Sequence, residues 1–338
     1  MNLIFGLCRI NLATMKIKPV IHSSFPRIGE QPDEQKLRRA FAGFEEGKIT
    51  KFEFEETQNR LVDDILGIQE KIGIEIVTDG LIRWYDPVSH LARNLGGFEI
   101  NGLLRFFDTN FYYRQPVAQG SVTQSDGLLT DEIKYAVGKS RKPVKGVMLG
   151  PLSLAAMSLN KSSQNLDDFC IGLGSLLGNL AAKMAAAGAN IVQVEEPWLV
   201  RNPERFDLFK AAYAKFAQAK GMARVLLTFY FGDAGRIIDR LSEIPADMFG
   251  IDFAYSPGLA DKLAVEGYPK GIAFGLIDGR NTKMESAADM ARQLEQMLKR
   301  MKGDEFHITT SCGLEFLPRS YAIRKLELTS KVAGLLNG

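Results

Sequence analysis

Eight short apolar runs divide the chain, and each is followed by a stretch with the hydrophobic spacing of an amphipathic helix. This alternation is typical of βαβ units and a parallel sheet. The runs are rich in Val, Ile, Leu and Phe, which suits strands buried on both faces. Eight such units predict an α/β fold, a single closed (β/α)8 TIM barrel, rather than an open sheet. The predicted strands cover residues 20–25, 74–78, 144–149, 190–195, 224–230, 248–253, 271–277 and 305–311.

The connections between the runs are predicted to be helices, with one long insertion. The helix at 166–187 stops before Gly188, a natural C-cap, and the region 33–72 is expected to form two helices. The segment 79–143, between the second and third strands, is long for a connection and predicts an inserted hairpin or lid. Its aromatic block at 106–113 fits either a small core of its own or a lid over a pocket.

Length and charge limit the classes of protein that fit this chain. The 338 residues suit one barrel domain, which we assign to 15–338. Lys and Arg number 42 and Asp and Glu number 40, so no charge surplus points to nucleic acid or an anionic membrane. No window reaches the roughly 18 apolar residues of a membrane span.

The N-terminal segment and the cysteines bear on the start and the compartment of the protein. An apolar run at 3–8 precedes Arg9, the reverse of the order in a secretory signal, so we interpret residues 1–14 as an extension or a misassigned start. The three cysteines are too scattered for a disulfide framework, which predicts a cytoplasmic protein. We interpret Cys312, in Ser-Cys-Gly, as functional and Cys8 and Cys170 as inert.

Polar side chains collect where the predicted strands end. The active site of such a barrel lies at these carboxyl ends. Asp79, Glu195, Glu196, Asp252 and Asp278 stand there and predict a concave acidic pocket suited to a metal, an amine or a cationic group. The alternative is that these acids cap the next helix, which we favour for Asp79 when it is considered by itself but not for the pair Glu195 and Glu196. Strand alternation predicts that one of Glu195 and Glu196 points inward and the other toward the helix layer.

Two histidines lie away from these strand ends. We interpret His307, near the far end of the eighth strand, as structural. His90 is predicted to be a surface or helix residue.

Several strand-end motifs together carry a family resemblance. The chain resembles the catalytic barrel of cobalamin-independent methionine synthase and the short core methionine synthases, from about residue 18 to the C-terminus. Their superfamily also contains uroporphyrinogen decarboxylase-like and coenzyme M methyltransferase barrels. The motifs are His-Ser-Ser-Phe-Pro-Arg at 22–27, Thr-Asp-Gly at 78–80, Gly-Pro at 150–151, Val-Gln-Val-Glu-Glu-Pro at 192–197 and Ser-Cys-Gly-Leu at 311–314.

The resemblance implies a zinc ion that ionises a thiol substrate, held by a His-x-Cys pair, a Glu and a Cys. Cys312 matches the last ligand, and Asp252 stands at the Glu position. The His-x-Cys pair falls on Thr228 and Tyr230, neither a good zinc ligand. Cys312 and Asp252 therefore form an incomplete metal set, and zinc binding in the family manner is not expected.

The resemblance also assigns positions in the substrate pocket. Ser24 matches a serine that lies against the substrate carboxylate, and Glu195 keeps the charge of an Asp. Leu81 stands roughly where the family has a Glu that holds the substrate amine, and Arg280 replaces a His. A folate-stacking Trp is Met157 here, as in core enzymes thought to take methyl from a corrinoid protein, so the donor is either a folate or a corrinoid protein.

Three functions follow from these residues. The first is methyl transfer to homocysteine or a related thiol. The second is a metal-independent, decarboxylase-like reaction on an acidic small molecule held by arginines. The third is a non-catalytic partner of a methyl-carrier protein. For the first, the predicted catalytic residues are Asp252, Cys312, Tyr230 and Arg280, and the predicted substrate-binding residues are His22, Ser24, Arg27, Asp79, Arg83, Glu195 and Asp278.

Overall fold

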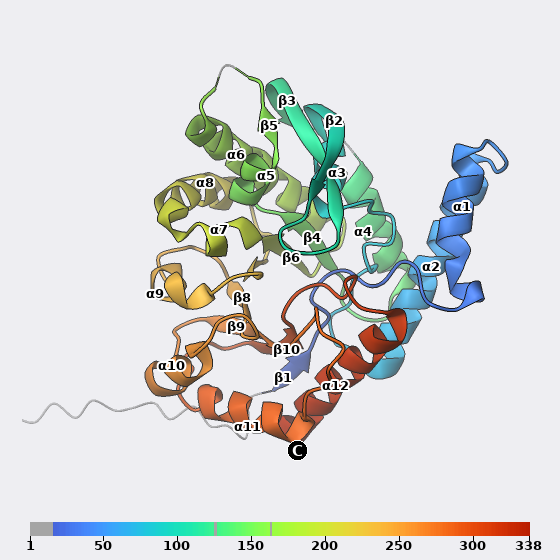
Figure 1. Cartoon of the computed structure of the whole chain (residues 1–338). Helices are drawn as coiled ribbons and strands as arrows, with labels where there is room; N and C mark the ends of the chain where they lie inside the picture. Colours follow the sequence, from blue (N-terminus) through green and yellow to red (C-terminus); the bar gives the residue numbers. More distant parts are fainter. Residues whose placement is uncertain (1–15, 125–126, 163) are drawn as a thin grey trace, which may run out of the picture.

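A curled parallel sheet forms the centre of the molecule (Figure 1). The computed structural model describes residues 16–124, 127–162 and 164–338, so the predicted extension at 1–14, with Cys8, lies outside it. Within these ranges the sheet runs in the order β1-β10-β9-β8-β7-β6-β4, and every pair is parallel. The strands are β1 (Ile17–Pro19), β4 (Lys145–Leu149), β6 (Ile191–Glu195), β7 (Val225–Phe229), β8 (Met248–Asp252), β9 (Gly271–Ile277) and β10 (Phe306–Thr310).

The two edges of this sheet meet through a seam at 76–77. Val20 pairs with Ile76 and Val77 pairs with Val144, both as isolated parallel bridges. Of the closed (β/α)8 barrel expected from the sequence, the curled parallel sheet is confirmed. Among the described residues this sheet has seven strands, because the strand expected at 74–78 is reduced to these two bridges. The side-chain amide of Gln69 bonds both the N–H and the C=O of Thr78, at 3.0 and 2.7 Å, and so takes the place of a neighbouring strand.

Helices cover the outside of the sheet (Figure 1). As expected, 33–72 holds two helices. In the second of these Thr50 accepts from Glu53 N–H in a capping box, and Gly73 ends the helix with φ 92°. The longer helices are α1 (Lys36–Glu45), α2 (Lys51–Ile72), α4 (Leu128–Lys139), α6 (Leu166–Ala186), α8 (Phe206–Ala219), α10 (Leu259–Glu266), α11 (Ala287–Leu298) and α12 (Arg319–Asn337). The shorter ones are α3 (Pro87–Arg93), α5 (Pro151–Met157), α7 (Pro197–Arg201) and α9 (Ile238–Leu241), with 3-10 turns at Pro32–Gln35, Pro203–Arg205 and Ala234–Arg236.

Helix α6 is both long and apolar. Among the described residues it is the one helix with the length and composition to cross a membrane, and half of that stretch is buried within the fold. A Cβ at Gly174 or Gly178 would meet the carbonyl oxygens of Ala212 and Phe216 in α8. The apolar character of α6 is therefore used in close packing against a neighbouring helix.

Two features project beyond the carboxyl ends of the strands. Strands β2 (Leu95–Arg105) and β3 (Tyr112–Gln124) form an antiparallel hairpin, and β5 (Leu159–Asn160) pairs with β3. Helices α1 and α2 form an arm that extends to the side (Figure 1). These two features and the barrel mouth surround the cavity described next.

Candidate active site

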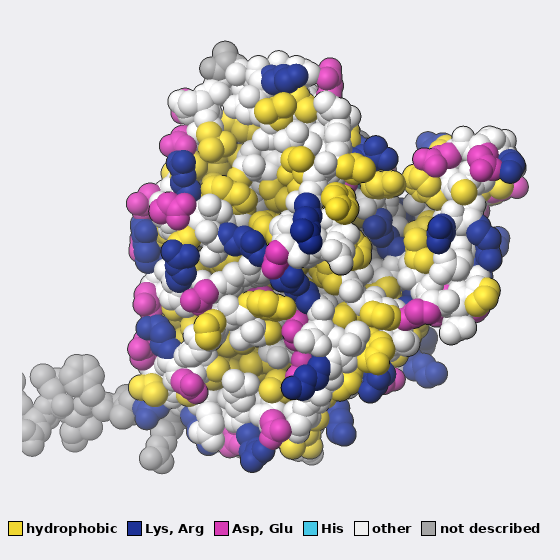
Figure 2. Space-filling view, in the orientation of Figure 1, with side chains coloured by type: hydrophobic (Ala, Val, Ile, Leu, Met, Phe, Trp, Pro, Cys, Tyr) yellow, Lys and Arg dark blue, Asp and Glu magenta, His cyan; other side chains and the backbone are white. Residues whose placement is uncertain are grey.

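A cavity of about 770 Å³ opens at the carboxyl ends of the strands. Its outer wall is largely aromatic, with side chains from the α1–α2 arm and the hairpin. Figure 2 shows hydrophobic side chains gathered on the body of the molecule beside the arm. Its inner end is polar. The outer lining includes Phe41, Phe44, Phe54, Trp84, Tyr85, Phe106, Phe111 and Tyr112, and the inner lining includes Ser23, Ser24, Glu195, Tyr230, Gly313 and Glu315.

Glu195 and Tyr230 form the centre of the inner end. The Tyr230 hydroxyl donates to Glu195 Oε2 at 2.8 Å, and Gln193 Nε2 donates to Oε1 at 2.7 Å. Burial raises the pKa of Glu195, and the bonds from Tyr230 and Gln193 oppose that rise. Burial, with the charge of Glu195, raises the pKa of Tyr230 well above its ordinary value. The pair therefore presents a carboxyl group whose proton affinity is raised and a tyrosine that stays protonated.

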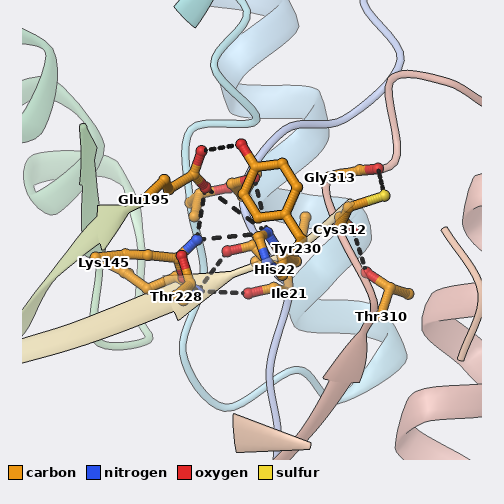
Figure 3. A network of polar contacts seen from close by, with 12 residues as sticks. Ile21, His22, Lys145, Glu195, Thr228, Tyr230, Thr310, Cys312 and Gly313 are labelled. Atoms are coloured by element: carbon orange, nitrogen blue, oxygen red, sulfur yellow. Dashed lines mark hydrogen bonds and ion pairs between the residues drawn. The ribbon is translucent and has the colours of Figure 1, made fainter. Parts of the chain in front are cut away.

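A buried lysine supports this pair from inside the barrel (Figure 3). Lys145 Nζ donates to the carbonyls of Ile21 and His22, at 2.7 and 2.5 Å, and to Gln193 Oε1 at 2.6 Å. Burial lowers its pKa to about 7, against the attraction of Glu195. His22, whose pKa is lowered by burial and by Lys145, lies with Nδ1 3.8 Å from Glu195 Oε1 and 3.0 Å from Ser23 Oγ. Lys145 thus ties the loop after β1 to Gln193, which holds Glu195.

Glu196 points the other way, as alternation along a strand requires. It accepts from the N–H of Leu152 and Ser153, at 3.0 and 2.8 Å, and from Ser153 Oγ at 2.6 Å. These donors belong to the first turn of α5, so Glu196 anchors a helix and takes no place in the cavity. Burial raises its pKa to about 7 against these three bonds.

Four predicted site residues lie at the ends of β8, β9 and β10 and do not line the cavity. Asp252 accepts from the backbone N–H of Phe231 and Tyr255, at 3.2 and 3.0 Å, and burial raises its pKa to about 7. The remaining three are Asp278, Arg280 and Cys312. Among the described residues, none of the four contributes to the cavity wall.

Arg280 belongs to the surface beside the hairpin turn. Its guanidinium lies 3.2 Å from Asp108 Oδ2 and packs over the rings of Phe231 and Tyr255. Asp278 Oδ1 accepts from the Arg280 N–H at 2.8 Å. These contacts fasten the hairpin turn to the barrel.

The four positions compared with zinc ligands do not form a tetrahedral set. Cys312 is fully buried, and its sulfur points toward the carbonyl of Gly313 at 3.4 Å (Figure 3). Burial, then the charge of Asp252, raises the pKa of its thiol well above the ordinary value. Thr228 Oγ1 faces the Val194 carbonyl, and Tyr230 is bonded to Glu195. In the part of the chain that is described, no three His, Cys, Asp or Glu side chains are grouped to hold a metal ion.

Arginines stand on the other side of the cavity. Arg83 Nη2 donates to Asn59 at 2.7 Å, whereas its buried Nη1 has no hydrogen-bond partner among the described residues and lies 3.8 Å from Asp79. Arg27 also lines the cavity, and burial lowers its pKa against the attraction of Glu315.

Asp79 holds a turn and does not cap the next helix, because α3 begins at Pro87 and has Asp86 as its N-cap. Its Oδ1 accepts from Leu81 N–H at 3.0 Å, and burial, with the charge of Glu132, raises its pKa to about 6. His90 lies on helix α3, so of the two expectations, a surface or a helix residue, the helix position is confirmed; the side chain is buried, with Nε2 3.1 Å from Glu132. His307 is buried in β10 with Nε2 2.9 Å from Glu305, a structural position.

Three residues of this site were not anticipated from the sequence. Lys145 and Gln193 lie on strands, where periodicity does not distinguish the barrel interior from the helix layer. Glu315 follows Cys312 by three positions in a loop. The one signal for it was a carboxylate directly after the Ser-Cys-Gly-Leu motif.

Comparisons with known proteins agree on one family. The model of the family described as "Cobalamin-independent synthase, Catalytic domain" matches residues 25–335. A methionine synthase of Saccharolobus solfataricus is 27% identical over 304 residues, covering 88% of this chain and 90% of that protein. A 5-methyltetrahydropteroyltriglutamate–homocysteine methyltransferase of Mycolicibacterium paratuberculosis is 25% identical over 85% of this chain and 40% of its own length.

Solved structures show the same fold. A B12-independent methionine synthase from Shewanella sp. W3-18-1, in complex with selenomethionine, superposes with a TM-score of 0.78 at 18% identity, covering 94% of this chain and 97% of that one. A putative vitamin-B12-independent methionine synthase from Listeria monocytogenes gives a TM-score of 0.71 at 16% identity, covering 96% and 99%.

Proposed function

Because the chain belongs to the cobalamin-independent methionine synthase family and is an enzyme of the methyltransferase class, we propose that it methylates the sulfur of homocysteine or a related thiol. The observation that carries this proposal is the Glu195–Tyr230 pair at the polar inner end of the cavity. It offers a buried proton acceptor where a small polar substrate fits, below an aromatic space large enough for a methyl donor.

Glu195 acts as the base in this reaction. Its raised pKa brings it closer to that of a thiol, so it takes the S–H proton more readily than an exposed carboxylate does. Tyr230 holds the carboxylate in place through its hydroxyl. The thiolate then attacks the methyl carbon, and the new C–S bond forms as the bond between the methyl group and its donor breaks. The proposed reaction does not use zinc. The four positions compared with zinc ligands, at Thr228, Tyr230, Asp252 and Cys312, do not form a set that fits this ion.

The outer cavity is assigned to the methyl donor. Aromatic side chains such as Trp84 and Tyr85 suit a flat ring system, and a relative in the family is named for a pteroyltriglutamate donor. A corrinoid protein is the alternative donor. Phe106, Phe111 and Tyr112 at the hairpin turn line the cavity, and we assign them the role of a lid that excludes water from the reacting thiolate.

The arginines favour a second candidate function. Arg27 and Arg83 both line the cavity, and Nη1 of Arg83, which has no hydrogen-bond partner among the described residues, has donors left for an anionic group. A metal-independent reaction on an acidic small molecule would use this side of the cavity in place of Glu195.

The two candidates are separated by a direct assay. Purified protein is incubated with homocysteine and either methyltetrahydrofolate or a methylated corrinoid, and methionine is quantified, with and without a metal chelator. We expect methionine to form in both conditions, and Glu195→Gln to slow its formation by about 100-fold or more, as loss of a general base does. The matched control is Glu204→Gln, an exposed carboxyl outside the cavity.

Other outcomes would redirect the assignment. Thermal stabilisation by tetrapyrrole or other polyacidic ligands, without methionine formation, would favour the second candidate. Neither turnover nor stabilisation would favour a non-catalytic partner of a methyl-carrier protein.

A further inference from the structure

Lys145 and Glu195 lie close together inside the barrel (Figure 3), and the side chain of Gln193 joins them. Lys145 Nζ donates to Gln193 Oε1 at 2.6 Å, and Gln193 Nε2 donates to Glu195 Oε1 at 2.7 Å. All three side chains are buried. In a buried network the polar groups have no water to replace a lost partner, so the direction of each bond matters.

The amide of Gln193 has two unlike ends. Its oxygen accepts hydrogen bonds and its nitrogen donates them, and a half-turn of the group exchanges the two with little change in shape. An ionised carboxylate only accepts, whereas a protonated carboxyl group also donates. The orientation of the Gln193 amide therefore decides which form of Glu195 it favours. With the nitrogen toward Glu195, it favours the ionised form.

Lys145 allows only this orientation. A lysine ammonium has three donors and no acceptor. Two of them bind the carbonyls of Ile21 and His22, at 2.7 and 2.5 Å, and the third meets the Gln193 amide. A reversed amide would place its NH2 group against these donors. The lysine thus requires the oxygen of Gln193 and leaves the nitrogen for Glu195.

The other titratable groups around Glu195 come from three further elements. Tyr230, after β7, donates to Oε2 at 2.8 Å, and His22, after β1, has Nδ1 3.8 Å from Oε1. Glu315, after β10, is close enough for the charge of Glu195 to raise its pKa. Burial raises the pKa of Glu195 itself, while its hydrogen bonds and the charge of Lys145 oppose that rise.

We propose that Lys145 is a positioning residue for methyl transfer: it holds the Gln193 amide in the orientation that keeps Glu195 an ionised proton acceptor. Lys145 does not line the cavity formed by the described residues, so it acts on the reaction through Gln193. This inference rests on the proposed function, in which Glu195 takes the proton of the thiol. It adds a residue whose loss changes the pH at which the base works.

Infrared difference spectroscopy tests the positioning without turnover. The carbonyl band of protonated Glu195, identified by its absence in Glu195→Gln, is followed against pH in the wild-type protein, Lys145→Met, Gln193→Met and the double variant. Each single variant should raise the pH of half-ionisation by about one unit or more, the effect of a lost hydrogen bond to a charged group. The double variant should match Lys145→Met, because without the lysine the amide no longer favours ionised Glu195.

Two results would overturn the proposal. Gln193→Met may leave the half-ionisation of Glu195 unchanged, which would show that the amide does not stabilise the carboxylate; this variant keeps the test decisive even where Lys145→Met fails to fold. Alternatively, Gln193→Met has its full effect in the Lys145→Met background, so that Lys145 acts by its charge alone.

Lys325→Met is the matched control for the loss of a buried lysine. Lys325 is fully buried and bonds the Lys283 carbonyl at 2.6 Å and Glu285 Oε2 at 2.7 Å, and it does not line the cavity. Its replacement should leave the half-ionisation of Glu195 unchanged, even where it lowers the free energy of unfolding. An equal rise in Lys325→Met would show a general loosening of the fold and would refute the positioning role.

The pH profile of kcat/KM for methionine formation connects the positioning to the reaction. The rate should rise with pH as Glu195 ionises, and in Lys145→Met this rise should move to higher pH by the amount that the infrared band moves. A band that moves while the rate profile does not would refute the role of Lys145 in the reaction. If the wild-type protein forms no methionine but the band moves as expected, the proposed function fails and the hydrogen-bond positioning of Glu195 is supported.

Discussion

Replacement of Tyr230 by Phe tests the central pair of the site through protein stability. The change deletes one hydroxyl, which donates to Glu195 Oε2 at 2.8 Å in a buried environment. A hydrogen bond to a charged group is worth about 1.5–3 kcal/mol, so the ionised form of Glu195 should be destabilised by that amount. At 1.36 kcal/mol per unit, this corresponds to a further rise of about 1 to 2 units in the pKa of Glu195.

The effect should depend on pH in a defined direction. Burial already places the folded pKa of Glu195 above its ordinary value of 4.5. Between the unfolded and folded pKa the folded state binds more protons, so this group's stability contribution is full at low pH and is lost as pH rises through the folded pKa. In the Tyr230→Phe variant the folded pKa of Glu195 is higher than in the wild-type protein. The free energy of unfolding of the variant therefore continues to fall with pH over a wider range. The difference from the wild-type protein should be small where Glu195 is protonated in both folded proteins, and should approach about 1.5–3 kcal/mol once the pH exceeds the folded pKa in the variant.

Urea unfolding over this pH range measures the difference, with Tyr213→Phe as the matched control. Tyr213 is also fully buried, but its hydroxyl has no hydrogen-bond partner among the described residues. Its replacement should leave the unfolding free energy unchanged or slightly higher at every pH. The assignment of Tyr230 as a donor to ionised Glu195 would be refuted by either of two results. The loss of unfolding free energy in Tyr230→Phe does not grow with pH, or Tyr213→Phe shows the same loss.

Other predictions follow from single contacts. Glu196→Ala should lower the unfolding free energy by about 3–5 kcal/mol in urea, because three donors in the first turn of α5 lose their acceptor; a milder loss, equal to that of Glu204→Ala, would contradict the anchoring role. Gly313→Ala should weaken methionine binding by about tenfold or more in calorimetry, because a Cβ there would overlap Ser24 Oγ and Glu315 Oε2 in the cavity wall; unchanged affinity would show that the substrate does not occupy this part of the cavity. Elemental analysis of the purified protein should find zinc well below one per chain, and equally so in Cys312→Ala; stoichiometric zinc lost in that variant would show that the ligand set is completed in a way this geometry does not contain.

Features of the fold that depend on periodicity along the chain were predicted from the sequence. Features that depend on contacts between distant residues were not. Continuous apolar runs identified the curled parallel sheet, and the alternation of residues along β6 separated Glu195 from Glu196. The length of the second strand was wrong because a side-chain amide, Gln69, occupies the bonds of Thr78. No pattern of hydrophobicity signals such a replacement.

The candidate site was predicted in outline and missed in detail for the same reason. Ser24, Glu195 and Tyr230 were placed by the rule that barrel sites lie at strand ends. Lys145 was missed because its acceptors on the loop after β1 are more than 120 residues away in sequence, and only closure of the sheet brings them together. Glu315 belongs to a loop, where no repeat fixes the direction of a side chain.

The seam at 76–77 has a consequence for how water reaches the interior. Most of the ring is joined by continuous strand ladders, but there the two edges meet by isolated bridges, with Lys145 N–H bonded to the Val77 carbonyl at 2.8 Å. Local opening begins where backbone bonding is sparsest. One opening event at this seam would therefore expose the Lys145 backbone amide and the buried network above it together. Their hydrogens should exchange for deuterium at a common rate, faster than those of the β8–β9 ladder.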